Sequence, residues 1–574
     1  TTNSSGNNAS TATLLLNGTG SQTIGASGGS GRLPNVRIDK TSGTLTLQDT
    51  LVVRASSWVW VQGTVDAGTS TVNFCCSSNG VSLAVDSGSM AFNNVGIDRG
   101  AWTTTITGTM TVAGNFTLTS VGTINGGTIT VGGNLTSTDT AVSGTTAITL
   151  NGTGAQTITT GTGDLPNGTL AINKTSGTAT LAANLALNGA GQDLTVIGTL
   201  DFAGFNVTIP DSFIIAAAGI VQLQGSETVT VSGTFAPLTG STVIYNGGGS
   251  YTGLPLGNGY SNLSFNNAAG TWTLNAALVA FGNITITTGL LDVSSSNHSV
   301  TLGGHWSNSG TFTARSGTVT LNGTAQNITG STTFNNLTKS VGSATTLTFA
   351  AGSTTTINGL ATLNGAAGQL LSLRSSSSPT RWNLNLAGTK SISYVDVQDS
   401  DASGSIAGNK PITPATSTNS GNTIAWFAGT FNGTVYSDQG ITPVAAGKTI
   451  RLLVNGANAG TTTTDGSGGY VITSSIGISV GDAVVAFIDM GGGVEPQATT
   501  VTVSDGVGSS GFDLYGGSVI TRYDNGVGTL TNAQMSSAQG AYVDSDILYG
   551  VSGGDLSVLG TTTTLIVPNG QSFV

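Results

Sequence analysis

Three carboxylates close together in the sequence are the strongest candidates for chemistry in this chain: Asp396, Asp399 and Asp401. Pairs of carboxylates act as general acid and base in polysaccharide cleavage, and carboxylate oxygens are preferred ligands of Ca²⁺. A polar turn that ends a stack of strands would carry the same residues without binding anything. We take the turn as the first interpretation and keep Ca²⁺ binding and catalysis as alternatives.

A second acidic set is more widely spaced and consists of Asp438, Asp465 and Asp482. Each of these residues lies beside glycine or other turn-forming residues. Aspartate at such positions closes turns by accepting backbone hydrogen bonds, and at loop tips it can also bind Ca²⁺. We expect turn chemistry here, with Ca²⁺ binding as the alternative.

Two tryptophans, Trp58 and Trp60, are separated by a single valine. In a strand, residues two apart point to the same face. An exposed pair could stack on the rings of a glycan, whereas an inward-facing pair would enlarge a hydrophobic core. The core is our first interpretation, and glycan stacking is the alternative.

Nucleophilic catalysis finds little support in the sequence. The pattern Gly-x-Ser-x-Gly occurs at residues 25–29 and 550–554, but a chain with 87 glycines produces it by chance. A nucleophile elbow also needs a strand–turn–helix context and a histidine partner. The only histidines are His298 and His305, and neither lies in an α/β pattern, so we expect both at the surface. We therefore expect that the protein is not an enzyme.

The only two cysteines, Cys75 and Cys76, are adjacent. Neighbouring residues of a strand point to opposite faces, so our first interpretation is one buried and one exposed thiol. A strained vicinal disulfide and an intermolecular bridge are the alternatives. The spacing matches no known set of metal ligands.

Charged residues are scarce, at 7% of the chain, and the net charge is −11. The 15 basic residues form no cluster, which argues against nucleic-acid binding. No run of 18 apolar residues is present, so we expect no transmembrane segment. The chain begins without a signal peptide and ends in a strand-like segment, and we expect the natural polypeptide to continue.

The elements that must position these residues are internal repeats. An Asn-Gly block begins at Asn17, Asn151 and Asn322, with a degenerate copy at Asn246. The spacings are 151 − 17 = 134, 246 − 151 = 95 and 322 − 246 = 76, all near multiples of 19. A second block recurs at residues 33–44 and 165–178. We infer a repeating unit of about 19 residues.

Within each unit, Thr alternates with aliphatic residues, and Gly-Gly, Asn-Gly or Ser-Gly pairs separate the runs, as at residues 128–131. Such alternation predicts half-buried strands joined by turns. Short strands on a fixed period predict an all-β, parallel β-solenoid. Some 22 coils at the spacing of paired strands would give a rod roughly 105 Å long. We expect aliphatic residues to stack inside and asparagines to form ladders along the coils.

The blocks at 322–328 and 333–338, with the closing stretch 392–404, resemble the repeats of filamentous-haemagglutinin-like and adhesin-like bacterial surface proteins. The resemblance covers most of residues 11–427. It implies a right-handed parallel β-helix exposed at the cell surface.

The composition changes after Trp426 and Phe427. Residues 449–454 are predicted to form a strand, and Asn455-Gly456 predicts a hairpin turn. The segment 464–470 resembles the turn of carboxypeptidase-regulatory-like or Ig-like modules, which implies a β-sandwich over residues 428–506. Residues 507–574 are expected to be a linker with further strands that could open another repeat unit, and residues 1–10 a tail that could add to a neighbouring chain as an assembly strand.

Two hypotheses about function follow. The first is an extracellular structural protein, either a cell-surface adhesin or a subunit of a filament or sheath, which associates with itself through β-strand contacts and contacts surface glycans or other cells. The second is a polysaccharide-binding or polysaccharide-degrading β-helix of the lyase or tailspike type. Neither requires a cofactor, although Ca²⁺ could bind at the first acidic cluster.

Overall fold

The computed structural model describes residues 12–26, 32–75, 81–490 and 496–574. Strands account for 53% of the chain, and they build a parallel β-solenoid of about 22 turns, which confirms the predicted all-β solenoid class. Contacts divide the chain into two compact units, Thr1–Ser294 and Ser295–Val574.

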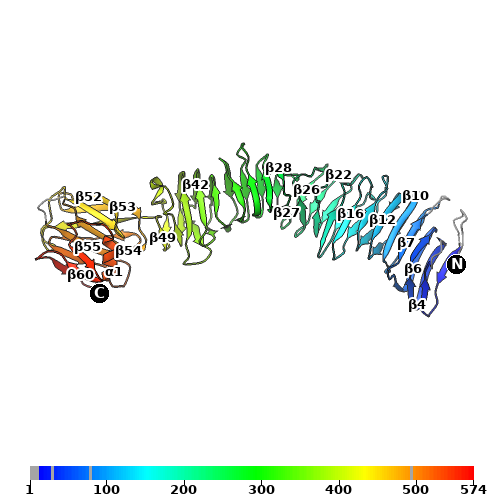
Figure 1. Ribbon diagram of the computed structural model, residues 1–574, viewed down its shortest axis with the longest axis horizontal. Coiled ribbons are helices and arrows are strands. Elements are labelled where there is room, and N and C mark those ends of the chain that lie inside the picture. The colour runs from blue at the N-terminus through cyan, green and yellow to red at the C-terminus, as the bar shows by residue number, and fades with distance from the viewer. Residues whose placement is uncertain (1–11, 27–31, 76–80, 491–495) are drawn as a thin grey trace. The chain divides into compact units, whose positions relative to one another are not determined.

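In the first unit, short parallel strands pair coil to coil (Figure 1). One series of paired strands comprises β1 (Thr13–Leu16), β2 (Gln22–Ile24), β3 (Arg32–Leu33), β4 (Asn35–Leu47), β5 (Thr50–Val53), β6 (Ser57–Asp66), β7 (Thr71–Cys75), β8 (Leu83–Asp86), β10 (Asn94–Thr107), β12 (Phe116–Asn125), β14 (Leu135–Ser137), β16 (Gln156–Thr159), β18 (Thr178–Leu181), β21 (Thr199–Asp201), β24 (Ile220–Leu223), β27 (Thr242–Tyr245), β28 (Ser250–Thr252), β30 (Asn262–Thr273) and β32 (Ile284–Asp292). A second comprises β9 (Ala91–Phe92), β11 (Thr109–Val112), β13 (Thr128–Val131), β15 (Ala147–Leu150), β17 (Leu170–Ile172), β20 (Leu194–Val196), β23 (Phe213–Ile215) and β26 (Phe235–Pro237). Smaller groups are β19 (Leu185–Ala186), β22 (Val207–Ile209) and β25 (Val229–Val231), and the pair β29 (Gly259–Tyr260) and β31 (Leu278–Ala280).

The second unit begins with further coils of the same kind. Three series of parallel strands build them: β33 (Val300–Leu302), β36 (Thr318–Leu321), β39 (Asn336–Ser340), β42 (Leu360–Asn364) and β45 (Thr389–Ser393); β34 (Trp306–Asn308), β37 (Gln326–Thr329), β40 (Thr345–Phe349), β43 (Leu371–Ser375), β46 (Val395–Val397) and β48 (Thr418–Asn419); and β38 (Thr332–Phe334), β41 (Thr354–Ile357), β44 (Trp382–Leu386), β47 (Ser400–Asp401) and β49 (Thr423–Ile424). The short strand β35 (Thr311–Thr313) and the 3-10 turn η1 (Ala407–Asn409) lie between them in sequence.

Coil length is not constant, in contrast to the predicted period of about 19. Thr109 pairs with Thr128, an offset of 128 − 109 = 19. Thr13 pairs with Asn35, an offset of 35 − 13 = 22, and Ala361 with Lys390, an offset of 390 − 361 = 29. The strands keep their pairing while surface turns absorb the extra residues, because lengthening a loop costs little free energy.

Inside each coil, alternate residues point inward and stack on similar residues of the next coil. In β13, Ile129 and Val131 are fully buried and lie in register with Ile148 and Leu150 of β15. Burying such a side chain contributes about 1.5–3 kcal/mol relative to leaving it exposed. The repeated alternation of Thr with aliphatic residues therefore sets both the strand and its inward face.

Outside, asparagines form the ladders expected from the sequence. The Oδ1 atom of Asn94 accepts a hydrogen bond from the Asn115 backbone N–H at 2.8 Å, and Asn115 Oδ1 accepts from the Asn134 N–H at 2.8 Å. Asn134 Oδ1 in turn accepts from the Thr157 N–H at 2.8 Å. Each amide thus satisfies a backbone donor at a coil corner that has no partner in the strand ladder.

The second unit ends in a part built on two sheets. One contains β52 (Ala457–Thr463), β51 (Thr449–Val454), β54 (Val480–Ile488), β55 (Ala498–Asp505), β58 (Ser518–Thr521) and β61 (Thr564–Ile566), and the other β53 (Gly469–Gly477), β50 (Ala428–Tyr436), β56 (Gly508–Ser509) and β57 (Leu514–Tyr515). Phe431 of β50 and Leu452 of β51 belong to one core cluster, so the two sheets share a core. The Ig-like or carboxypeptidase-regulatory-like identity of this part stays a prediction.

The far face of the six-stranded sheet is covered by the helix α1 (Asn532–Gln539) and the hairpin of β59 (Tyr549–Ser552) and β60 (Asp555–Val558). Met535 of α1 is fully buried in that second core cluster. The predicted hairpin at Asn455-Gly456 is confirmed, since it joins β51 to β52 with both residues at positive φ. Residues 507–574, expected to combine a linker with further strands, contain β58 and β61, and both strands pair within the six-stranded sheet.

Candidate functional site

The three carboxylates of the first acidic cluster do not converge. Asp396 forms an ion pair with Arg374 and accepts a hydrogen bond from Ser420 Oγ at 2.5 Å. Asp399 is buried and accepts from Asn422 Nδ2 at 2.5 Å. Each carboxylate therefore has its own partners within the protein.

Asp401 accepts the backbone N–H of Ser403 at 2.8 Å, as in a turn closed by aspartate. Within the described ranges, no group of three or more His, Cys, Asp or Glu side chains could hold a metal ion. This corrects the alternative of a shared Ca²⁺ site at Asp396, Asp399 and Asp401, because strand and turn direct the three side chains to separate partners.

The aspartates of the second acidic set close turns. Asp438 Oδ1 accepts from the backbone N–H groups of Ile441 and Thr442, and these hydrogen bonds, that of Thr442 foremost, lower the pKa of Asp438. Asp465 accepts from Ser467 and Gly469, and the Ser467 side chain is the main cause of its lowered pKa.

The third member, Asp482, accepts from Asn455 Nδ2 at 2.8 Å and from the Ser479 N–H at 2.7 Å. All three carboxylates thus have the hydrogen bonds that turn chemistry predicts. In this set the interpretation from the sequence agrees with the geometry.

The two tryptophans have different environments. Trp58 is fully buried and packs against Phe74 and Phe92, with ring centroids 5.9 and 5.4 Å away. It offers no face to a glycan, which corrects that alternative for Trp58. Trp60 is half-buried and donates from Nε1 to Gly63 O at 3.1 Å. Its ring lies against Gly88, where an added Cβ would come within 2.1 Å of it.

Cys75 is buried and disulfide-bonded, which removes the first interpretation of two free thiols. Cys76, the only other cysteine, lies outside the described residues. His305 is exposed, and its Nδ1 accepts from the Asn327 N–H at 3.0 Å, the contact that asparagine makes in the ladders. His298 directly follows the turn at residues 294–297 and is half-buried.

Sequence reasoning missed a set of buried lysines, Lys40, Lys174 and Lys339, which are 1%, 6% and 0% exposed. Each ammonium group is held by two backbone carbonyls and one glutamine Oε1. We call this arrangement a lysine cage. In the described part of the chain, no ion pair joins any of the three to a carboxylate.

The geometry of the cage repeats. Lys339 Nζ donates to Gly323 O at 2.8 Å, to Thr324 O at 3.1 Å and to Gln326 Oε1 at 2.7 Å. The other two sets are Lys40 with Gly18 O, Gly20 O and Gln22 Oε1, and Lys174 with Gly152 O, Gly154 O and Gln156 Oε1. The Gln326 amide is itself fixed, because its Nε2 donates to Leu302 O and Gly304 O.

Burial shifts the titration of Lys174 and Lys339. It lowers the pKa of Lys174 and lowers that of Lys339 to about 8. Desolvation disfavours the charged form, and carbonyl oxygens compensate it only in part. A signal for the cages was present in the sequence, since a glutamine lies four or five residues after Asn17, Asn151 and Asn322, and a lysine lies within each second block, at Lys40 and Lys174.

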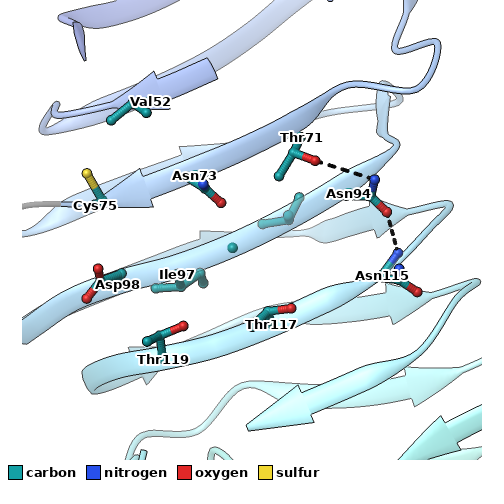
Figure 2. A pocket seen from close by; sticks show the side chains of 12 residues that line it. Val52, Thr71, Asn73, Cys75, Asn94, Ile97, Asp98, Asn115, Thr117 and Thr119 are labelled. Carbon is teal, nitrogen blue, oxygen red and sulfur yellow. Dashed lines mark hydrogen bonds between the residues drawn. The ribbon is translucent and has the colours of Figure 1, made fainter. Parts of the chain in front are cut away.

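A surface groove with a volume of about 470 Å³ lies on the outer face of three consecutive coils of the first unit, over β7, β10 and β12 (Figure 2). Its polar lining includes Thr71, Asn73, Asn94, Asp98, Asn115, Thr117 and Thr119. On this outer face, outward-pointing residues of neighbouring strands line up in three rows that run across the strands. In the middle row, Gly96 lies between Asn73 and Thr117.

The described residues contain no helix long and apolar enough to cross a membrane. No family profile, no curated protein and no solved structure matches this chain.

Proposed function

We propose that this chain is an extracellular structural protein, either a cell-surface adhesin or a subunit of an extracellular filament or sheath, and that it is not an enzyme. The solenoid fold is compatible with that role. The resemblance of its repeats to adhesin-like and filamentous-haemagglutinin-like proteins supports it as well.

The observation that carries the proposal is that polar side chains of the solenoid form hydrogen bonds from one coil to the next. Asparagine ladders join successive coils, and the lysine cages place three cations where they bind only the protein's own oxygens. These asparagine and lysine side chains hold one coil on the next. An arrangement of this kind favours a long-lived rod over an enzyme.

Electron microscopy of the full chain at increasing concentration, with immunogold labelling of cells that produce it, tests the proposal. We expect label at the cell surface, with either rods projecting from it or filaments. Label confined to the cell interior would contradict both versions. Particles of unchanged mass at every concentration would contradict the filament version alone.

A polysaccharide-binding role is the second candidate, and the groove over β7, β10 and β12 favours it. The degrading version is less well supported, because Asp396, the carboxylate first considered for it, is ion-paired with Arg374. Incubation with neutral and acidic polysaccharides separates binding from cleavage, since only cleavage releases new reducing ends or unsaturated products.

A further inference from the structure

We propose that the groove over β7, β10 and β12 is a binding site for a neutral glycan. This inference rests on the proposed adhesin function and deepens it by naming the class of ligand. It differs from the glycan hypothesis drawn from the sequence, which relied on Trp58 and Trp60.

The groove exists because one position in the outer face lacks a side chain. Gly96 pairs with Asn73 of the preceding coil and with Thr117 of the following one. A Cβ atom added at Gly96 would come within 2.3 Å of Asn73 Oδ1, so the Asn73 amide leans over the gap. Figure 2 shows Asn73 and Thr117 on the two strands that flank β10.

The row of Thr71, Asn94 and Asn115, which lies beside the gap, is closed by internal hydrogen bonds. Asn94 Nδ2 donates to Thr71 Oγ1 at 3.5 Å, and Asn94 Oδ1 accepts from the Asn115 N–H at 2.8 Å (Figure 2). This row follows the ladder pattern of the rest of the outer face. It leaves those amides little capacity for a ligand.

The other two rows differ from this one. No described residue forms a hydrogen bond with the side chains of Asn73, Asp98 or Thr117. Asp98 is exposed, and Asn73 and Thr117 are half-buried. These groups together supply amide donors, a hydroxyl and a carboxylate acceptor to a ligand in the groove.

That set fits a ligand whose groups both donate and accept, as sugar hydroxyls do. An anionic ligand would meet the Asp98 carboxylate, and the neighbouring Arg99 is directed inward, where it donates to Ala55 O at 3.1 Å. A peptide cannot add as a strand here, because β10 is already paired on both sides by β7 and β12. The row from Asn73 to Thr117 spans two strand spacings, roughly 10 Å, about the length of a disaccharide.

Calorimetric titration of the full chain with neutral hexasaccharides tests the site. The probes are cellohexaose, maltohexaose, laminarihexaose, mannohexaose and hexa-N-acetylchitohexaose, with hexagalacturonate as the charged comparison. We expect saturable binding of at least one neutral probe and weaker or absent binding of hexagalacturonate. Gly96→Asn fills the gap and should weaken that binding at least tenfold, and Asp98→Ala at least threefold.

Gly342→Asn is the matched control, since an added Cβ at Gly342 meets nothing within 4 Å. Its affinity should equal that of the wild type. Should Gly96→Asn fail to fold, the exposed Asp98→Ala variant carries the test. Absence of binding to every neutral probe, preference for hexagalacturonate, or unchanged affinity in Gly96→Asn and Asp98→Ala would each overturn the site. Surface labelling and filament formation do not depend on the groove, so its failure is distinguishable from failure of the adhesin proposal.

Discussion

The lysine cages show how a charged side chain can be buried in a solenoid, because its ammonium group donates hydrogen bonds to nearby carbonyl and glutamine oxygens. A carboxylate partner at Lys339 would have to be buried as well, at further desolvation cost. Two main-chain carbonyls and Gln326 Oε1 satisfy the ammonium group instead. In return the lysine satisfies carbonyls at a corner where the strand ladder leaves them without partners.

The Lys339 cage predicts a rise in stability with pH. Burial lowers the pKa of Lys339 to about 8 in the folded chain, against the usual 10.5 when unfolded. Between these values the unfolded chain binds more protons, so the free energy of unfolding increases with pH. Below pH 8 both states are protonated and the cost of burying the charge is present in full.

Urea unfolding at several pH values from 7 to 10.5, followed by tryptophan fluorescence, measures this effect. Lys339→Met should show a smaller increase in stability over the window than the wild type. Lys410→Met, which removes an exposed lysine, should keep the full increase. Equal slopes for wild type and Lys339→Met would contradict the prediction.

At the scale of elements, the ladders explain how coils of different length stay in register. At the corner between two strands, a backbone N–H group needs a hydrogen-bond acceptor, whatever the length of the neighbouring turn. Asparagine does so with its side chain, as at Asn94 and Asn115, and His305 does so at another corner. The register is therefore fixed at the corners, and surface turns can vary.

Removing one asparagine side chain from a ladder should lower the local stability of the coil corner that it supports. Asn115→Ala removes the acceptor of the Asn134 N–H, at a cost of about 1 kcal/mol. Hydrogen exchange should quicken at Asn134, with little change in distant coils. Thr130→Ala is the control, since no described residue forms a hydrogen bond with the Thr130 side chain. Unchanged exchange at Asn134 would show that the ladder bond adds nothing to local stability.

At the scale of the whole molecule, the last coil of the second unit continues directly into the two-sheet part. The Ile478 N–H donates to Phe427 O at 3.0 Å, and Ser479 Oγ donates to Thr423 O. Gly477 approaches so closely that an added Cβ would lie 2.2 Å from the Ala425 backbone. These contacts cover the end of the coil stack, where exposed strands would otherwise be free to join other chains.

Gly477→Ala should open this junction. Because the clash is with backbone, the chain must shift, at a cost of about 1–3 kcal/mol. Limited proteolysis should then cut near residues 425–428 faster than in the wild type. Gly466→Ala, where an added Cβ meets nothing within 4 Å, should leave the rate unchanged. Equal cleavage rates in both variants would show that the junction is held by other contacts.

The sequence by itself determined the solenoid, its inward faces and its ladders. Alternation of Thr with aliphatic residues acts within one strand, and the Asn-Gly turns act within a few residues, so both are local signals. The hairpin at Asn455-Gly456 followed for the same reason.

Only the tertiary structure decided which residues meet across coils. Three features depend on how one coil lies on the next. They are the cage of Lys40 with Gln22, the separation of Asp396 from Asp401, and the gap between Asn73 and Thr117. The offsets between paired residues of successive coils vary from 18 to 29 residues, so a constant period cannot supply these contacts. The full burial of Trp58, in contrast to the half-buried Trp60, was undetermined for a related reason. Both occupy the same face of one strand, and only packing against Phe74 and Phe92 assigns Trp58 to the core.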